Sequence, residues 1–204
     1  MADVHPADDG ATRPSQWNVP NVLTAIRVLL VPVFAWMLLS HPHDQTWRWW
    51  TTLVFIVAIL TDFADGRIAR KYNLVTDFGK LWDPIADKAL TGMAFVGLSI
   101  IGELQWWVTA IILIREWGIT WLRQSLLKYD FVMAANKGGK LKTLTQSLAL
   151  ILYLTWLPQQ PVVVQWLGWL LMAAAFVLTV VTGLDYVRAA RRHRAAWRAE
   201  HGQG

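Results

Sequence analysis

The 204-residue chain contains no cysteine, and only 16% of its residues are charged. The absence of cysteine excludes disulfides, thiolate metal sites and a cysteine nucleophile. A soluble domain carries charge on about a quarter of its residues, so the low charged fraction argues against a soluble protein. By contrast, 55% of the residues are apolar and the mean hydropathy is +0.34. Because one crossing needs about 20 apolar residues, the chain has room for about six membrane spans and little else.

Six apolar runs, separated by proline, glycine and charged residues, account for most of the chain. They predict an all-α, polytopic membrane protein with six transmembrane helices. The runs cover residues 19–39, 47–61 (continuing helically towards 69), 81–101, 106–127, 141–157 and 162–187. The predicted organisation is a disordered cytoplasmic N-terminus at 1–16, one six-helix catalytic domain at 17–187 and a basic cytoplasmic tail at 188–204.

Lysine and arginine are distributed unevenly between the two sides of this arrangement. The loops after the first, third and fifth runs contain only Arg48, at the edge of the second run. Most other basic residues lie in the remaining loops and the terminal segments. Because positively charged loops stay in the cytoplasm, both termini and the loop between the second and third runs are predicted to be cytoplasmic.

Four aspartates lie where the second and third runs adjoin. The segment TDFADGRIARKYNLVTDFGKLWDPIADK has the pattern D-x-x-D-G-x-x-A-R, eight residues, then G-x-x-x-D-x-x-x-D. Its acids are Asp62, Asp65, Asp83 and Asp87. At about 100° per helical residue, each pair of acids lies with its glycine on one stripe of a helix. Charged groups near membrane depth are costly and usually functional.

Four carboxylates without an equal set of bases indicate a cation site. Carboxylate oxygens suit Mg²⁺ or Mn²⁺, and four of them are enough to hold two ions in a clamp that serves displacement at phosphorus. Gly66 and Gly79 leave room for a bulky ligand near the backbone, and Arg70 offers a planar donor for a phosphate. The alternative is that the acids cap helices or pair with neighbouring basic side chains.

The complete acidic pattern resembles the signature of the CDP-alcohol phosphatidyltransferases. The resemblance implies six transmembrane helices, a homodimer, two divalent cations (Mg²⁺ or Mn²⁺) and a CDP-linked lipid donor, with no nucleic acid as partner. It also implies that the four aspartates are metal ligands and that Asp87 is the general base. In this interpretation Gly66, Arg70 and Thr76 contact the CDP moiety, with Gly79 near it.

A second polar group lies in the fourth and fifth runs. Arg115, Glu116 and Arg123 lie in an otherwise apolar helix. They are followed by a glycine-rich helix start that carries Lys137, Lys140 and Lys142. Because helix N-termini also attract anions, this group predicts a pocket for a phosphate on the acceptor. The alternative is that the lysines only set the topology, and that Glu116 pairs with one of the arginines.

The stretches IREWGITWLR, GGKLKT and DPIADK resemble a bacterial branch of the family, the phosphatidylglycerophosphate synthases. This resemblance implies CDP-diacylglycerol as donor, glycerol 3-phosphate as acceptor, a role in phospholipid biosynthesis and a location in the bacterial inner membrane. WNVPNVLTAIR also resembles the first helix of that branch and puts Asn21 and Thr24 near the nucleotide, although both residues could simply begin the helix.

Three other functions remain open from the sequence. A cardiolipin synthase or a phosphatidylinositol phosphate synthase would have the same fold with another acceptor. A divalent-cation transporter would use the same carboxylates, but it needs polar groups along a path to both membrane faces. The outer halves of the runs are nearly free of charge, apart from Arg48 and Glu103 at the boundary, which disfavours the transporter.

Overall fold

The computed structural model describes residues 19–71, 77–127 and 137–201. These residues form helices and contain no β-strand, which confirms the all-α prediction. The elements, in chain order, are α1 (Val19–Ser40), α2 (Gln45–Lys71), α3 (Asp77–Ile100), α4 (Trp106–Leu127), α5 (Lys137–Leu154), the 3₁₀ turn η1 (Leu157–Gln159) and α6 (Val162–His201).

The helices agree with the six predicted apolar runs, although three of them differ at their ends. The α5 helix covers Lys137–Leu154, whereas its run was predicted at 141–157. The α3 helix begins at Asp77, ahead of its apolar run, so both halves of the acidic motif lie on helices. The α6 helix continues through Arg188 to His201, so the segment predicted as a basic tail extends the last helix. Alanine and arginine dominate this extension, and both residues favour the helix.

Local signals set two helix ends at the α1–α2 and α3–α4 reversals. Asp44 caps α2, because its Oδ1 accepts the backbone N–H groups of Thr46 (2.9 Å) and Trp47 (3.1 Å). At the end of α3, Gly102 has a φ of 80°, which favours glycine. The next N–H, of Glu103, returns to the Leu98 carbonyl at 2.9 Å and closes the helix end.

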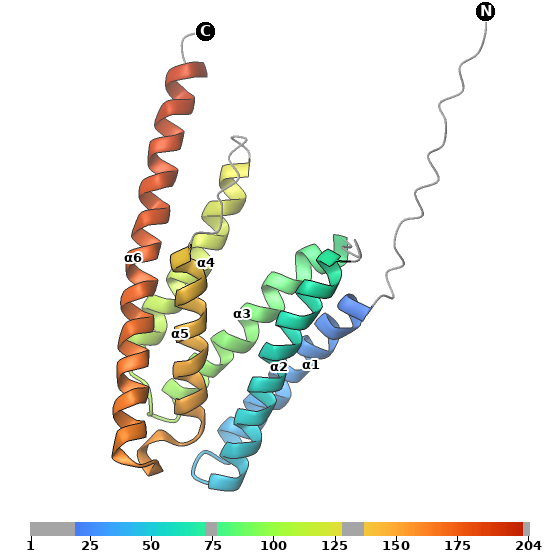
Figure 1. Cartoon of the computed structure of the whole chain (residues 1–204), viewed down its shortest axis with the longest axis vertical. Coiled ribbons are helices and arrows are strands. Elements are labelled where there is room, and N and C mark those ends of the chain that lie inside the picture. Colours follow the sequence, from blue (N-terminus) through green and yellow to red (C-terminus); the bar gives the residue numbers. More distant parts are fainter. Residues whose placement is uncertain (1–18, 72–76, 128–136, 202–204) are drawn as a thin grey trace, which may run out of the picture.

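The helices pack as two groups that meet at one end of the molecule (Figure 1). The α1 helix packs mainly against α2 and α3, and α6 packs mainly against α5 and α4. The three reversals α1–α2, α3–α4 and α5–α6 lie at the lower end of the view, and the other helix ends diverge above them. Most of the buried apolar core lies towards this lower end, with Phe34, Phe55, Phe95, Leu98 and Leu154 all fully buried.

Arg48 is completely buried where these reversals meet. Its guanidinium donates to both Glu103 carboxylate oxygens, at 2.9 and 2.7 Å. It also donates to the carbonyls of Leu154 (2.8 Å), Tyr153 (2.7 Å) and Pro42 (3.3 Å). One side chain of α2 therefore joins the α1–α2 and α3–α4 reversals to the end of α5. Arg48 and Glu103, which are 55 residues apart in the sequence, therefore form an ion pair.

Large apolar side chains are exposed on all six helices, among them Trp36, Leu60, Ile100, Trp121, Leu144 and Val163. Among the described residues, one helical stretch, Val162–Arg194, is long and apolar enough to cross a membrane, judged by length and composition alone. Ala25–Ser40 and Lys88–Ile100 are shorter apolar stretches. An apolar surface on every helix is typical of contact with lipid or with another protein.

Replacing Arg48 by methionine should destabilise the fold strongly. The substitution leaves the Glu103 carboxylate without its cation and also removes the bonds to the end of α5. Breaking a buried ion pair in this way costs about 3–5 kcal/mol. We expect a clear drop in the apparent unfolding temperature of the detergent-solubilised protein.

The conservative change Arg48→Lys keeps the charge but loses the planar fork, so its effect should be smaller. The double variant Arg48→Met/Glu103→Gln should unfold at a higher temperature than Arg48→Met alone. An unaltered unfolding temperature for Arg48→Met would contradict the structural role of the pair.

Candidate functional site

The two halves of the acidic motif lie on adjoining helix ends. Asp62, Asp65, Gly66 and Arg70 belong to the last part of α2, and Gly79, Asp83 and Asp87 belong to the first part of α3. Only residues 72–76 separate the two helices, so their ends lie within about 20 Å of each other. The side chains of these seven residues, and all of Thr76, lie outside the described part of the chain. Their roles as metal ligands, base and CDP contacts stay predictions.

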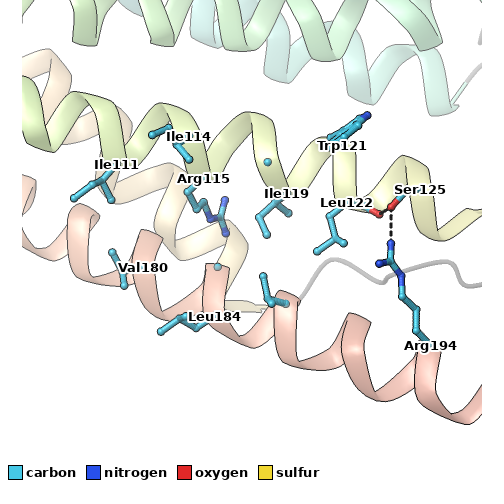
Figure 2. Close-up of a pocket in the computed structure, with 13 residues that line it drawn as sticks. Ile111, Ile114, Arg115, Ile119, Trp121, Leu122, Ser125, Val180, Leu184 and Arg194 are labelled. Carbon is cyan, nitrogen blue, oxygen red and sulfur yellow. Dashed lines mark hydrogen bonds between the residues drawn. The ribbon is translucent and has the colours of Figure 1, made fainter.

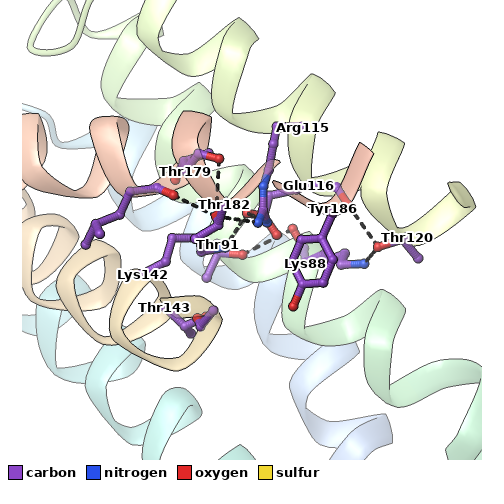
Figure 3. A network of polar contacts seen from close by, with 12 residues as sticks. Lys88, Thr91, Arg115, Glu116, Thr120, Lys142, Thr143, Thr179, Thr182 and Tyr186 are labelled. Atoms are coloured by element: carbon purple, nitrogen blue, oxygen red, sulfur yellow. Dashed lines mark hydrogen bonds and ion pairs between the residues drawn. The ribbon is translucent and has the colours of Figure 1, made fainter. Parts of the chain in front are cut away.

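A polar network lies between α3, α4, α5 and α6 (Figure 3), and its α3 member Lys88 directly follows the acidic motif. Its members come from four helices, and most of their neighbours in the sequence are apolar. The charged members are Lys88, Arg115, Glu116, Arg123 and Lys142. The network therefore contains the arginines that the sequence predicted to bind the acceptor phosphate.

Glu116 is the carboxylate at the centre of the network. Its Oε1 accepts from Arg115 Nη1 at 3.2 Å and also contacts the ammonium of Lys142 on α5. The side chains of these two cations are only 14% and 6% exposed. Since buried charges need partners, Glu116 holds two cations from different helices in place.

Tyr186 of α6 contacts both arginines of α4. Arg123 Nη2 donates to the Tyr186 hydroxyl at 2.8 Å, and its guanidinium lies 4.8 Å from the ring centroid. The Arg115 guanidinium lies 5.9 Å from the same ring and donates to Thr182 Oγ1 at 2.7 Å. A Cβ added at Gly183 would lie 3.0 Å from Arg115 Cγ, so the glycine leaves room for this side chain. The α6 helix thus positions both guanidinium groups.

Lys88 connects the network to the helix that carries the acids. It follows Asp87 directly on α3, and its ammonium contacts Thr120 Oγ1 of α4. Thr120 in turn donates to the Glu116 carbonyl at 2.9 Å. The second half of the acidic motif therefore ends one residue from a side chain that reaches the arginine-bearing helix.

The other residues predicted to bind the acceptor phosphate or the CDP moiety differ in where they lie. Lys142 is buried in the network, whereas Lys140 is exposed on α5 and makes no contact with the network among the described residues. The side chains of Lys137, Asn21 and Thr24 lie outside the described part of the chain. The predicted roles of Lys137 and Lys140, and those of Asn21 and Thr24, remain untested.

The sequence reasoning missed Thr182 and Tyr186, the residues of α6 that hold the arginines. With Thr179 they are spaced three and four apart, which puts all three on one face of an otherwise apolar helix. All three are buried. A polar stripe of this kind was the signal that could have identified them.

The described part of the network carries an excess of positive charge. It contains four basic side chains, those of Lys88, Arg115, Arg123 and Lys142, and one carboxylate, that of Glu116. Partly buried basic side chains that outnumber the carboxylates among the described residues favour the binding of an anion. Arginine in particular binds phosphate with a planar pair of donors. The chemistry of the network therefore suits a phosphate group.

These features define a class of protein: an all-α protein with an apolar exterior, an acidic motif on two adjoining helix ends and a cationic network suited to phosphate. The sequence comparison narrows the class. The family model of CDP-alcohol phosphatidyltransferase matches residues 17–181. The chain belongs to the CDP-alcohol phosphatidyltransferase family, as the acidic pattern predicted.

Curated relatives cover most of the chain. It is 44% identical to a "Probable phosphatidylglycerophosphate synthase" of Mycobacterium tuberculosis, over 86% of this chain and 82% of that protein. It is 37% identical to the Bacillus subtilis "CDP-diacylglycerol--glycerol-3-phosphate 3-phosphatidyltransferase", over 83% and 93% of the two chains. The Shigella flexneri protein of the same name is 38% identical, over 86% of this chain and 96% of that protein.

Replacing Glu116 by glutamine should destabilise the helix packing. Arg115 and Lys142 would then lie buried together with no carboxylate between them. Because the Glu116 side chain is 18% exposed and partly screened, we expect a loss of about 2 kcal/mol, below the range for fully buried pairs. For a chain of this length such a loss corresponds to roughly 5 °C in the unfolding temperature.

Adding Lys142→Met to Glu116→Gln should recover part of the loss, because one uncompensated cation is removed. The matched control is Asp185→Asn, which removes the acid of the exposed pair with Arg188. This control should change the stability by less than about 1 kcal/mol. Equal effects of Glu116→Gln and Asp185→Asn would contradict the role given to Glu116.

Proposed function

We propose that the protein transfers the phosphatidyl group from CDP-diacylglycerol to glycerol 3-phosphate, giving phosphatidylglycerophosphate and CMP. The names of the Bacillus and Shigella relatives state this donor and acceptor. The observation that carries the proposal is that α6 holds Arg115 and Arg123 by hydrogen bonds, close to Lys88 on the helix of the acidic motif. Two guanidinium groups suit a phosphate monoester with a charge of about −1.5 to −2.

The acceptor is held on the network side. Arg115 and Arg123 bind the phosphate of glycerol 3-phosphate, and Tyr186 keeps the two guanidinium groups in place. Lys142 adds charge from α5, while Lys140 and Lys137 attract the acceptor from the start of that helix. This leaves the hydroxyl end of the acceptor free to point towards α3, where Lys88 and Asp87 adjoin.

The donor is held on the side of the acidic motif. Gly66 and Gly79 leave room for the CDP moiety, which Arg70, Thr76, Asn21 and Thr24 contact. The carboxylates of the motif fit Mg²⁺ or Mn²⁺ by their donor chemistry, since hard oxygens suit hard ions. Two such ions, when bound, would neutralise charge on the pyrophosphate and on the leaving CMP.

Asp87 acts as the general base. It accepts the proton of the primary hydroxyl of glycerol 3-phosphate, and the oxygen attacks the phosphorus that carries diacylglycerol. The bond between that phosphorus and CMP breaks, so one phosphodiester forms as one phosphoanhydride is cleaved. Holding both reactants in line supplies much of the rate enhancement.

The membrane arrangement is part of the proposal. The six helices cross the inner membrane, with both termini and the active site on the cytoplasmic side. The exposed apolar side chains on every helix support six crossings. The basic loops and the arginines at the end of α6 support the orientation. A homodimer is implied by the family and remains a prediction.

One assay tests the choice of acceptor. Purified protein is incubated with CDP-diacylglycerol and Mg²⁺ or Mn²⁺, and CMP release is followed with glycerol 3-phosphate, phosphatidylglycerol or inositol phosphate in separate reactions. We expect release with glycerol 3-phosphate. Release only with one of the other acceptors would indicate a cardiolipin synthase or a phosphatidylinositol phosphate synthase, and no release with any acceptor would favour a transporter.

Asp87→Asn should lower turnover by about 10³-fold, because the amide cannot accept the proton. Binding of CDP-diacylglycerol in the presence of Mg²⁺ should be largely retained. Asp185→Asn, which changes an acid of α6 outside the motif, serves as the control and should leave turnover unchanged. Near-normal turnover of Asp87→Asn would show that another group is the base.

Tyr186→Phe should raise the KM for glycerol 3-phosphate about 5-fold, because it removes one hydrogen bond to Arg123 and keeps the ring. The kcat and the KM for CDP-diacylglycerol should stay the same. Tyr153→Phe makes the same chemical change at the other end of the molecule and should alter neither KM. A shared rise in both KM values for Tyr186→Phe would contradict a specific role on the acceptor side.

A further inference from the structure

A small pocket of about 90 Å³ lies at the end of the molecule where the helix reversals meet. It is formed by Glu103 of the α3–α4 loop, by Tyr153 of α5, and by residues of the α5–α6 reversal and the start of α6. It differs from the groove of about 720 Å³ between α4 and α6, which is lined mainly by apolar side chains (Figure 2). The small pocket has polar groups that can select one kind of ligand.

Glu103 is the charged side chain of the pocket. Its two carboxylate oxygens each accept one hydrogen bond from Arg48, at 2.9 and 2.7 Å. A carboxylate has about four acceptor positions, so about two stay open to a ligand. Arg48 itself is completely buried and does not line the pocket, and neither does any other basic side chain. The charged group that a ligand meets in the pocket is therefore the carboxylate.

Two further polar side chains of the pocket offer acceptors. Gln165 Nε2 donates to the carbonyls of Pro158 (3.2 Å) and Gln160 (2.9 Å). Because both N–H groups of this amide are engaged, Gln165 offers the pocket only its oxygen. Tyr153 is 7% exposed, and its hydroxyl has no hydrogen-bond partner among the described residues. The pocket is therefore rich in acceptors and suits a ligand with several donors.

Two aromatic side chains and a small volume restrict the ligand further. Tyr153 lines the buried side of the pocket, and Trp169, which is 48% exposed, lines its open side. Aromatic rings attract cations. A water molecule takes up about 30 Å³ in the liquid, so the pocket has room for about three groups of that size. These properties together fit an ammonium group on a short carbon arm.

Exposed tryptophans mark the level of the pocket along the helices. They lie in the first or last two turns of helices next to the reversals, and each is between 48% and 59% exposed. They are Trp36, Trp49, Trp50, Trp106, Trp107, Trp166 and Trp169. Indole rings favour the membrane–water boundary. In the proposed membrane arrangement, the pocket therefore lies at the level of the lipid headgroups.

We propose that this pocket binds the primary ammonium of an ethanolamine phospholipid in the leaflet at the reversal end. The ammonium donates to Glu103, Gln165 and Tyr153, and the rest of the headgroup leaves past Trp169. A choline headgroup has the same charge but no N–H donor, so it binds less tightly. The inference rests on the proposed membrane arrangement. It does not depend on the transfer reaction, because the pocket and the acidic motif lie at opposite ends of the helices.

A series of headgroups with fewer and fewer N–H donors tests the proposal. The detergent-solubilised full chain is mixed with phosphatidylethanolamine, its N-methyl and N,N-dimethyl forms, or phosphatidylcholine, all with the same acyl chains, and bound lipid is counted by native mass spectrometry. We expect binding to fall with each methyl group, to about 10-fold less for phosphatidylcholine. Equal binding of the first and last lipids would overturn the proposal.

Soluble competitors separate the ammonium from the rest of the lipid. A large excess of ethanolamine should displace bound phosphatidylethanolamine, whereas ethylene glycol, which has no ammonium, should not. Displacement by both compounds or by neither would overturn the assignment of the ammonium. Binding of ethanolamine by a chain that retains no phosphatidylethanolamine would show that the ligand is a soluble amine, and would overturn the lipid as occupant.

Two variants locate the site. Tyr153→Phe removes the hydroxyl and keeps the ring, and it should lower phosphatidylethanolamine binding about 5-fold at an unchanged unfolding temperature. Trp169→Leu removes a ring and should lower binding about 3-fold. The matched controls are Tyr186→Phe and Trp50→Leu, because neither residue lines the pocket. Wild-type binding by both pocket variants, or an equal loss in the controls, would overturn the site.

CMP release by the two pocket variants is measured in parallel. It should stay at the wild-type level, because neither residue lies near the acidic motif or the network around Glu116. Loss of lipid binding with normal CMP release supports a site that is separate from the reaction. Loss of CMP release in proportion to the loss of lipid binding would overturn that separation.

Discussion

A single guanidinium holds the closed end of this bundle together. Arg48 is fully buried and bonds to Glu103, to the end of α5 and to the loop after α1. A cation in an apolar interior is tolerated only when its donors are satisfied, so these segments must meet at one place. Most of the apolar core packs near this meeting point, and the opposite helix ends lie further apart (Figure 1). Those diverging ends carry the acidic motif and lead to the cationic network.

The charged clusters around Arg48 and Glu116 differ in their ratio of basic to acidic side chains. This difference indicates a structural role for the first cluster and a binding role for the second. Around Arg48, one cation meets one carboxylate and several carbonyls. Around Glu116, one carboxylate serves Arg115 and Lys142, and further basic side chains lie close by. Arg48 is closed off from solvent and its cluster stabilises the fold by itself, whereas Arg115 and Arg123 are only partly buried and stay within reach of a ligand. Two partly exposed arginines side by side support a phosphate-bearing substrate.

Much of the fold followed from short-range patterns. Apolar runs and the residues that interrupt them predicted all six helices. The length of an apolar run and the position of glycine or proline are local properties that can be read from the sequence. The continuation of α6 to His201 was missed, because hydropathy was used as the boundary and the basic extension is polar but strongly helical. Of the residues predicted to bind the acceptor phosphate, Arg115, Arg123 and Lys142 lie together in the polar network. Lys140 and Lys142 are two apart and so face different ways on a helix, and the chain alone offered no means to decide which one is buried.

The sequence by itself determined the family and the acidic motif, because that motif depends on spacings of three and four residues along two helices. Only the tertiary structure decided which side chains meet. Arg115 bonds Thr182 across 67 residues, Arg123 bonds Tyr186 across 63, and Lys142 reaches Glu116 across 26. Helical periodicity places a residue on a face, but it carries no information on which helix packs against that face. That choice is made by the long-range packing of α4, α5 and α6, which brings their polar stripes together.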